Sequence, residues 1–208
     1  MKCWRCGGTG SISKDFKNGL GWTTKICPVC NGSGSVKISA DNILLLIDVQ
    51  NGFRNEYTEP KIKEIHNFIY QYGFKKIIAT KFINYEDSLF VTNLDYTDMM
   101  FSNEQEIVEE IKPFISAVSL KHTYNCVNSN FLEQLMILND GQKPEQVLIA
   151  GFDTEGCVLA SAIGLFDAGI IPMVLADFVA SSQGEDNHNY GLEIMKTLFG
   201  QGSIVKLG

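Results

Sequence analysis

The chain has 208 residues, of which 45% are hydrophobic, and a formal net charge of −7. This length and composition allow one full domain with a buried core plus a small appendage, and they exclude a disordered protein. No apolar run approaches the roughly 18 residues of a membrane-spanning helix, and the first residues lack the apolar stretch of a secretory signal. We therefore expect a cytoplasmic protein without membrane contact.

Charge is distributed unevenly along the chain. Residues 1–38 contain six lysines and arginines against one aspartate, a charge of +5, which leaves −12 for the remaining residues. An acidic body repels nucleic acid, so any contact with a polyanion is expected to run through the basic N-terminal segment. The alternative is that these basic residues serve only the solubility of a small module.

The N-terminal segment contains a short motif that occurs twice. Residues 3–10 read CWRCGGTG and residues 27–34 read CPVCNGSG, which gives the pattern CxxCxGxG in both places. Two cysteines with this spacing direct both sulfurs at one metal ion, and two such pairs complete a tetrahedral site that suits Zn²⁺. We predict a single structural zinc, no organic cofactor, and four ligands: Cys3, Cys6, Cys27 and Cys30. Free or disulfide-bonded cysteines are the less favoured alternative. A segment this short cannot form an adequate hydrophobic core and needs a cross-link, which the metal would provide.

These repeats resemble the cysteine-rich zinc domain of DnaJ-type chaperones, in which the same motif occurs four times and builds two zinc centres. The resemblance covers about residues 1–36 and implies a metal site, but it does not imply one function, because related fingers bind proteins, bind RNA or only support a fold. Residues 18–21 indicate a turn between two strands, and residues 33–41 a short linker. The hydrophobic side chains of the segment form either a binding face or a small core: Trp4, Phe16, Leu20 and Trp22.

From Asn42 onward, apolar runs alternate with segments of helical periodicity. This alternation predicts one α/β domain, residues 39–208, with a parallel sheet covered on both faces. The predicted strands are Ile43–Asp48, Lys76–Phe82, Ala117–Lys121, Gln146–Phe152, Ile171–Ala176 and Ile204–Leu207. The predicted helices are Glu59–Tyr72, Glu104–Lys112, Asn130–Leu138, Gly156–Ala168 and Asn187–Phe199. In such sheets the ligand site lies beyond the carboxyl ends of the strands, so polar residues there are the candidates for chemistry.

Three strand ends carry such residues. Asp48 closes a continuous apolar run and suits a general acid/base, while Lys121 ends the third strand. Cys157 follows the fourth strand at the start of a helix, where the helix dipole and a nearby ammonium are expected to lower the pKa of its thiol and make it a nucleophile. Each residue also has a structural interpretation: a turn cap, a surface lysine and a buried apolar filler. The remaining thiol, Cys126, is predicted to be inert.

The segments IDVQNGF at 47–53, VSLK ending at Lys121, and GFDTEGCV at 151–158 resemble the isochorismatase-like hydrolases, a superfamily that includes nicotinamidases, carbamoylsarcosine amidase and ureidoacrylate amidases. The resemblance spans about residues 42–208. It implies a three-layer α/β/α fold with a six-stranded, Rossmann-like parallel sheet in the order 3-2-1-4-5-6. It also implies a triad of Asp48, Lys121 and Cys157, a cis peptide between Phe152 and Asp153, and an oxyanion hole formed by the amides of Asp153 and Cys157.

The same resemblance implies amide hydrolysis through a thioester on Cys157, with a small amide or ureido compound as substrate. Nicotinamidases have a metal site that includes histidines, part of it after the second strand. Asn84 stands where such a histidine is expected, so a nicotinamidase is disfavoured. Isochorismatases proper cleave a vinyl ether and need no thiol, which also favours C–N hydrolysis here.

We expect the substrate to contact Phe53, Phe82, Asn84 and Tyr85. The aromatic and methionine-rich residues 84–102 either line this pocket or form an oligomer contact. A second hypothesis treats the chain as a regulatory or interaction protein, in which the basic finger binds nucleic acid or a protein partner and the hydrolase domain is a scaffold. Because helix faces commonly pair subunits in this superfamily, a homo-oligomer is expected.

Overall fold

The computed structural model describes residues 3, 6–15, 22–27 and 38–207. The chain divides into two compact units, Met1–Ile38 and Ser39–Lys206. In the first unit, β1 (Ser11–Asp15) and β2 (Trp22–Ile26) form an antiparallel pair in which Ser11 lies opposite Ile26. These strands flank the turn predicted at 18–21, but the turn itself lies outside the described residues. So do Trp4, Phe16, Leu20, Cys30 and most of the predicted linker.

The second unit is built on a six-stranded parallel sheet with the order β5-β4-β3-β6-β7-β8. Counted from the first strand of this unit, that is the predicted order 3-2-1-4-5-6. The strands are β3 (Ile43–Ile47), β4 (Lys76–Phe82), β5 (Ala117–Lys121), β6 (Gln146–Phe152), β7 (Ile171–Ala180) and β8 (Ile204–Val205). All five residues of β3 are buried, because helices cover both faces of a parallel sheet.

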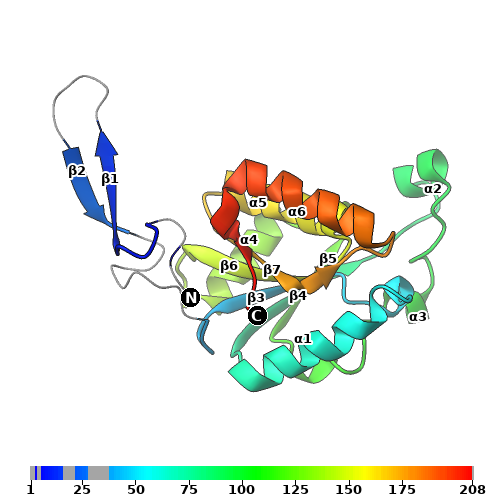
Figure 1. The fold of residues 1–208 in the computed structure, drawn as a ribbon. Helices are drawn as coiled ribbons and strands as arrows, with labels where there is room; N and C mark the ends of the chain where they lie inside the picture. Colours follow the sequence, from blue (N-terminus) through cyan, green and yellow to red (C-terminus); the bar gives the residue numbers. More distant parts are fainter. Residues whose placement is uncertain (1–2, 4–5, 16–21, 28–37, 208) are drawn as a thin grey trace. The chain divides into compact units, whose positions relative to one another are not determined.

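Helices cover the sheet in two layers (Figure 1). Helix α1 (Glu59–Tyr72) lies on one face, and α4 (Ser129–Leu138), α5 (Leu159–Asp167) and α6 (Glu185–Phe199) lie on the other. Two short helices, α2 (Leu89–Leu94) and α3 (Ser102–Gln105), occur in the long connection between β4 and β5. The predicted three-layer α/β/α architecture is confirmed for this unit.

Helix α1 shows how local sequence sets these elements. It begins with a proline in its first turn, where the missing N–H group costs no helical hydrogen bond. Ile62, Ile65 and Ile69 recur at helical spacing and are buried against the sheet. The helix ends at Gly73, whose backbone adopts the left-handed conformation (φ 61°) and donates its N–H to the Ile69 carbonyl.

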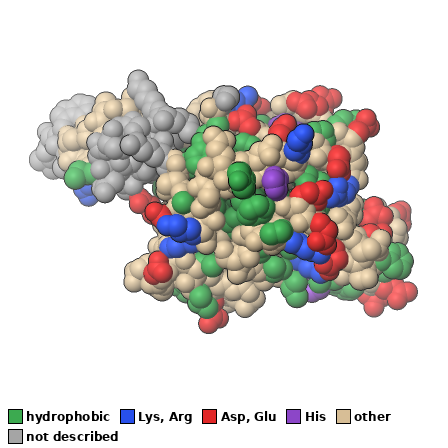
Figure 2. Space-filling view, turned by 90° about the horizontal axis from the view of Figure 1, so that it is seen from below, with side chains coloured by type: hydrophobic (Ala, Val, Ile, Leu, Met, Phe, Trp, Pro, Cys, Tyr) green, Lys and Arg blue, Asp and Glu red, His purple; other side chains and the backbone are tan. Residues whose placement is uncertain are grey.

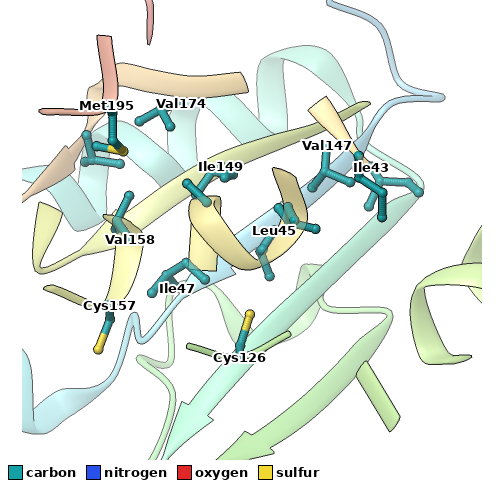
Figure 3. Close-up of a cluster of buried hydrophobic side chains, with 14 of the residues drawn as sticks. Ile43, Leu45, Ile47, Cys126, Val147, Ile149, Cys157, Val158, Val174 and Met195 are labelled. Carbon is teal, nitrogen blue, oxygen red and sulfur yellow. The ribbon is translucent and has the colours of Figure 1, made fainter. Parts of the chain in front are cut away.

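The core on the α4–α5–α6 side contains buried side chains from four strands, β3, β4, β6 and β7, and from the three helices. Figure 3 shows part of this cluster, in which Ile43, Leu45 and Ile47 from β3 lie beside Val147 and Ile149 from β6. The alternating residues of β3 point to one face of the sheet, as the two-residue period of a strand requires. Burial on this scale fixes the register of β3 and β6, and with it the positions of the loops that follow them.

The helix predicted at Glu104–Lys112 is wrong. The described chain has α3 at Ser102–Gln105 and a 3₁₀ turn at Lys112–Phe114 instead. Residues 106–108 between them are extended, because Asn51 donates to the Glu106 carbonyl and Val108 donates to the Val49 carbonyl, and residues 109–111 form a turn. These tertiary hydrogen bonds to the segment that follows β3 override the helical periodicity of the sequence.

The expected cis peptide between Phe152 and Asp153 is also wrong, because no cis peptide bond occurs among the described residues. The chain reverses at this point through Asp153 instead, which adopts the left-handed backbone conformation (φ 59°, ψ 71°). A trans bond with a positive φ at an aspartate costs less than a cis non-proline bond, which carries a penalty of about 3 kcal/mol.

Candidate active site

The three residues of the predicted triad lie beyond the carboxyl ends of β3, β5 and β6. Asp48 follows β3, Lys121 is the last residue of β5, and Cys157 lies in a π-helical turn, Thr154–Val158, between β6 and α5. Strand β3 pairs with β4 on one side and with β6 on the other. The strands before β6 are added to one side of β3 and those from β6 onward to the other side, so the strand order reverses at this point. Such a reversal opens a crevice in which open α/β sheets bind ligands.

Lys121 connects the three side chains. Its Nζ lies 2.7 Å from Asp48 Oδ2 and donates a hydrogen bond to Cys157 Sγ at 3.2 Å. The ammonium also donates to the carbonyls of Thr123 and Tyr124, at 2.9 and 3.3 Å. Burial alone would lower the pKa of Lys121, but the charge of Asp48 and the adjacent Cys157 raise it above its ordinary value. The lysine therefore stays charged and rigidly held beside the thiol.

Asp48 is almost completely buried and is held by Thr80 on the neighbouring strand. Thr80 Oγ1 donates to Asp48 Oδ1 at 2.5 Å and accepts from the Asp48 backbone N–H at 2.9 Å. The second carboxylate oxygen, Oδ2, forms the ion pair with Lys121 but receives no aligned hydrogen bond in the described chain. This oxygen is thus available to accept a proton.

The pKa of the Cys157 thiol is raised, contrary to the expectation of a lowered pKa. Burial and the charge of Asp48 raise the pKa of Cys157 well above that of an ordinary thiol, and Lys121 only partly opposes them. Figure 3 shows the Cys157 sulfur directed away from the labelled apolar side chains, whereas the Cys126 sulfur points toward them. Burial raises the pKa of Cys126 to about 12, so its thiol is unreactive near neutral pH.

The backbone around Cys157 is shaped by Asp153. The Asp153 carbonyl accepts hydrogen bonds from Gly156 N at 3.0 Å and Val158 N at 3.1 Å, which winds the turn into a π-helix. Single π-helical turns of this kind are frequent at functional sites. The Asp153 side chain accepts from Ser182 N through Oδ1 at 2.9 Å, which ties the turn to the end of β7.

A cavity of about 630 Å³ opens onto Cys157. Its walls are mostly aromatic and aliphatic, with Phe53, Phe82, Phe90, Leu94, Tyr96, Tyr124, Leu159 and Ile163 among the lining side chains. The polar lining comes from Asp153, Glu155, Ser182 and Gln183. A pocket of this size and composition accommodates a small organic molecule.

Two of the four predicted substrate contacts, Phe53 and Phe82, line this cavity. Asn84 is buried beneath the segment that follows it, where its Nδ2 donates to the carbonyls of Tyr96 and Asp98. Tyr85 is half exposed and packs edge-on against the ring of His122. Neither Asn84 nor Tyr85 is among the lining residues.

Several residues of the site had no distinct signal in the sequence. Thr80 lies within a buried strand, and only its register beside Asp48 distinguishes it from any other buried threonine. Phe90 and Tyr96 belong to the region that the aromatic composition of residues 84–102 had indicated, whereas Tyr124 follows Lys121 in a loop. Their convergence depends on the position of α2, which the sequence did not predict.

The cysteines of the first unit form a second cluster. The Sγ atoms of Cys3, Cys6 and Cys27 all lie within 4.8 Å of one another, and the Cys3 and Cys27 sulfurs are 3.8 Å apart. The sulfurs of a tetrahedral zinc site with bonds of 2.3 Å are also separated by about 3.8 Å. Gly10 N donates to Cys6 Sγ at 3.2 Å, a contact typical of metal-bound thiolates. These three cysteines could hold a metal; Cys30 lies outside the described residues.

The model of the isochorismatase domain matches residues 42–203. The chain belongs to the isochorismatase family. Its fold is similar to an isochorismatase-like hydrolase from Alkaliphilus metalliredigens (18% identity, 76% of this chain and 91% of the other, TM-score 0.64). It is also similar to N-carbamoylsarcosine amidase from Thermoplasma acidophilum (17%, 79% and 94%, TM-score 0.63). A third similar structure is pyrazinamidase of Pyrococcus horikoshii in complex with zinc (19%, 80% and 98%, TM-score 0.63). A search of curated proteins found no match.

The surface of the second unit is acidic with interspersed basic groups. On the face seen in Figure 2, basic side chains lie among acidic ones, and no extended basic patch occurs among the residues described there. Ion pairs such as Lys81–Glu106 (2.7 Å) and Arg54–Glu110 (2.8 Å) neutralise several of these charges. Within the described residues, no helix has the length and hydrophobicity needed to cross a membrane.

Proposed function

We propose that this member of the isochorismatase family is a cysteine-dependent amidase that hydrolyses a C–N bond of a small amide or ureido compound. The observation that carries the proposal is the position of Lys121 Nζ, 2.7 Å from Asp48 Oδ2 and 3.2 Å from Cys157 Sγ. A base, a cation and a thiol in mutual contact beside a cavity are the groups that nucleophilic acyl transfer requires. Carbamoylsarcosine amidase and nicotinamidases of similar fold support the choice of an amide substrate.

The first half-reaction forms a thioester. Asp48 takes the proton of the Cys157 thiol as the sulfur attacks the substrate carbonyl, and Lys121 stabilises the charge that passes between them. The backbone amides of Asp153 and Cys157 then hold the oxyanion, a contribution of about 3 kcal/mol per donor. The C–N bond breaks, and the proton on Asp48 goes to the leaving nitrogen, which departs as ammonia or an amine.

The second half-reaction returns the enzyme to its resting form. Asp48 removes a proton from a water molecule as the water oxygen attacks the thioester carbonyl. The C–S bond breaks, the acid product is released, and Cys157 regains its proton from Asp48. The raised pKa of Cys157 suits this cycle. The thiol keeps its proton between turnovers and loses it to Asp48 only when the sulfur attacks the substrate.

We propose a structural role for the N-terminal unit, in which Cys3, Cys6, Cys27 and Cys30 hold one Zn²⁺. The 3.8 Å separation of the Cys3 and Cys27 sulfurs supports this metal. A segment of this size is too short to form an adequate hydrophobic core, and bound zinc would stabilise it by cross-linking the two cysteine pairs.

Ammonia release from a panel of primary amides and ureido compounds tests the proposed activity. The intact protein is compared with Cys157→Ala and with Cys126→Ala, a matched control that removes a buried thiol away from the cavity. Release by the intact protein and by Cys126→Ala, but not by Cys157→Ala, is the expected result. If no compound yields ammonia, the interaction protein becomes the better hypothesis, and salt-dependent retention of the basic finger on nucleic acid tests it.

A further inference from the structure

The cavity beside Cys157 has an unbalanced negative charge. Two carboxylates, Asp153 and Glu155, belong to its lining, and no lysine, arginine or histidine does among the described residues. Lys121 lies behind Cys157, and its ammonium is already neutralised by Asp48. A ligand that enters the cavity therefore meets no positive side chain that could pair with a carboxylate or phosphate.

Asp153 supplies one of these carboxylates and is only partly buried. Its Oδ1 accepts from Ser182 N at 2.9 Å, and the Ser182 side chain also hydrogen-bonds to this carboxylate. Burial raises the pKa of Asp153, and a cation bound beside it would favour the charged form. Glu155 differs, because Ser181 Oγ donates to its Oε1 at 2.7 Å, while its Oε2 is itself buried, without a hydrogen-bond partner in the described chain. The charge of Asp153 also reaches the walls of the cavity, since it acts with burial to raise the pKa of both Tyr96 and Tyr124.

Aromatic rings surround the same space. Phe90 packs edge-on against Phe82 and against Tyr124, with ring centroids 5.0 and 4.8 Å apart, and all three rings line the cavity. Tyr96 adds a further ring near Phe90. The faces of such rings attract cations, most strongly where water is excluded. A carboxylate among aromatic walls is thus suited to an ammonium or guanidinium group and unsuited to an anion.

We propose that the substrate is an amide that carries a positively charged amine or guanidinium group, which Asp153 binds within the aromatic cavity. This inference rests on the proposed amidase function, because it assigns the substrate class of the same site. Asp153 would contribute its backbone amide to the oxyanion hole and its side chain to recognition. Amides with a carboxylate in place of the cation would be excluded by repulsion from Asp153 and by the lack of a counter-charge.

The test uses three amides of similar shape that differ in charge: para-(aminomethyl)benzamide, para-(hydroxymethyl)benzamide and para-carbamoylbenzoate. Binding of each to Cys157→Ala is measured by calorimetry, and ammonia release is measured with the intact protein. We expect the cation to bind roughly tenfold or more tightly than the anion, with the neutral compound between them. Equal binding of cation and anion, or binding of none at millimolar concentration, would overturn the inference.

Variants of Asp153 in the Cys157→Ala background test whether the Asp153 carboxylate causes the preference for the cationic compound. Asp153→Asn keeps the acceptor for Ser182 N and tolerates the positive φ, and Asp153→Gly suits the same backbone should the first variant fold poorly. Both are expected to reduce the preference for the cation to near unity while binding of the neutral compound changes less than about twofold. The matched control Glu155→Gln should keep most of the preference. A preference that survives both Asp153 variants contradicts the assignment.

The two proposals fail in different ways. If ammonia is never released but Cys157→Ala still ranks the three compounds by charge, the amidase is wrong and the cation site stands. If ammonia is released with no ranking by charge, the amidase stands and the assignment of Asp153 is wrong.

Discussion

Gly151 brings β6 so close to β3 that a side chain at this position would collide with the backbone of Ile47. A Cβ on Gly151 would lie 2.6 Å from the Ile47 nitrogen and closer still to its carbonyl oxygen, and the glycine has a φ of +126°. Ile47 precedes Asp48, and Gly151 lies six residues before Cys157. The close approach of these two strands therefore influences the distance between Asp48 and Cys157.

Gly151→Ala should destabilise the protein by about 3 kcal/mol or more, because it adds both overlap and backbone strain. Urea denaturation of the purified variant provides the measurement. Gly141→Ala is the matched control: it also has a positive φ, of +80°, but nothing lies within 4 Å of the added Cβ. That variant should lose only about 1 kcal/mol. Equal losses in the two variants would contradict the importance of the contact between Gly151 and Ile47.

Thr80→Val should reduce kcat by about tenfold to a hundredfold. Losses of this size are typical when a hydrogen-bond partner that orients a functional side chain is removed. The substitution keeps the shape of the side chain but removes the hydroxyl that donates to Asp48 Oδ1. Steady-state kinetics on the best amide of the panel is the measurement. Thr80→Ser keeps the hydroxyl and should retain most of the activity; equal activity of the valine and serine variants would show that this hydrogen bond does not position the base.

Lys121→Met should cost about 3–5 kcal/mol of stability, because it leaves the buried carboxylate of Asp48 without a counter-charge. Lys81→Met removes one partner of a more exposed ion pair and should cost less than about 1 kcal/mol. The double variant Asp48→Asn/Lys121→Met should recover part of the lost stability. Thermal and chemical denaturation distinguish these cases, and a double variant less stable than Lys121→Met would contradict the account.

The reactivity of Cys157 toward iodoacetamide should be low near neutral pH and rise as the medium becomes alkaline. Its raised pKa means that the unreactive thiol predominates below that pKa and the thiolate only above it. Asp48→Asn removes a negative charge that raises this pKa and leaves the positive charge of Lys121, so alkylation at about pH 7.5 should accelerate. Hydrolysis should fail in the same variant. Mass spectrometry of the peptide containing Cys157 gives the rate; slower alkylation of Asp48→Asn would contradict the assigned charges.

The purified full chain should contain about one zinc ion per molecule, bound by the cysteine cluster of the first unit. Cys27→Ser should lose most of this zinc, because it removes one of the sulfurs that lie within 4.8 Å of one another. Cys126→Ser, which changes a buried cysteine of the second unit, is the control and should retain the metal. Elemental analysis after gel filtration measures the content, and full zinc occupancy in Cys27→Ser would contradict the site.

Much of the fold of the second unit was predictable from sequence. The bounds of β4, β5, β6 and α1 coincide with the predicted ranges, because apolar runs and helical periodicity are local properties. The order of the strands came from resemblance to a family rather than from periodicity. The strand-end positions of Asp48, Lys121 and Cys157 also followed from local pattern, and the structure brings all three side chains into contact with Lys121 as their centre.

The remaining features depend on contacts between distant segments. The backbone at Glu106 and Val108 is extended because it pairs with Asn51 and Val49, which no window of sequence around Glu106 reveals. The pKa of Cys157 was misjudged because a helix terminus and a lysine are visible in sequence, whereas the depth of burial is not. The position of the Asp153 side chain depends on a left-handed backbone at this residue, where a cis peptide bond was expected instead.

The parallel topology also bears on the order in which the site can assemble. Leu44 on β3 pairs with Ile77 on one side and with Leu148 on the other, a partner about three times more distant along the chain. Closing the longer loop costs more conformational entropy, and contacts of high sequence separation slow folding. Asp48 and Lys121 come from the half of the sheet whose strands pair with nearer neighbours, while Cys157 arrives only with β6. A growing polypeptide that has not yet supplied β6 therefore lacks Cys157, so the candidate site is completed only after β6 has been synthesised and has paired with β3.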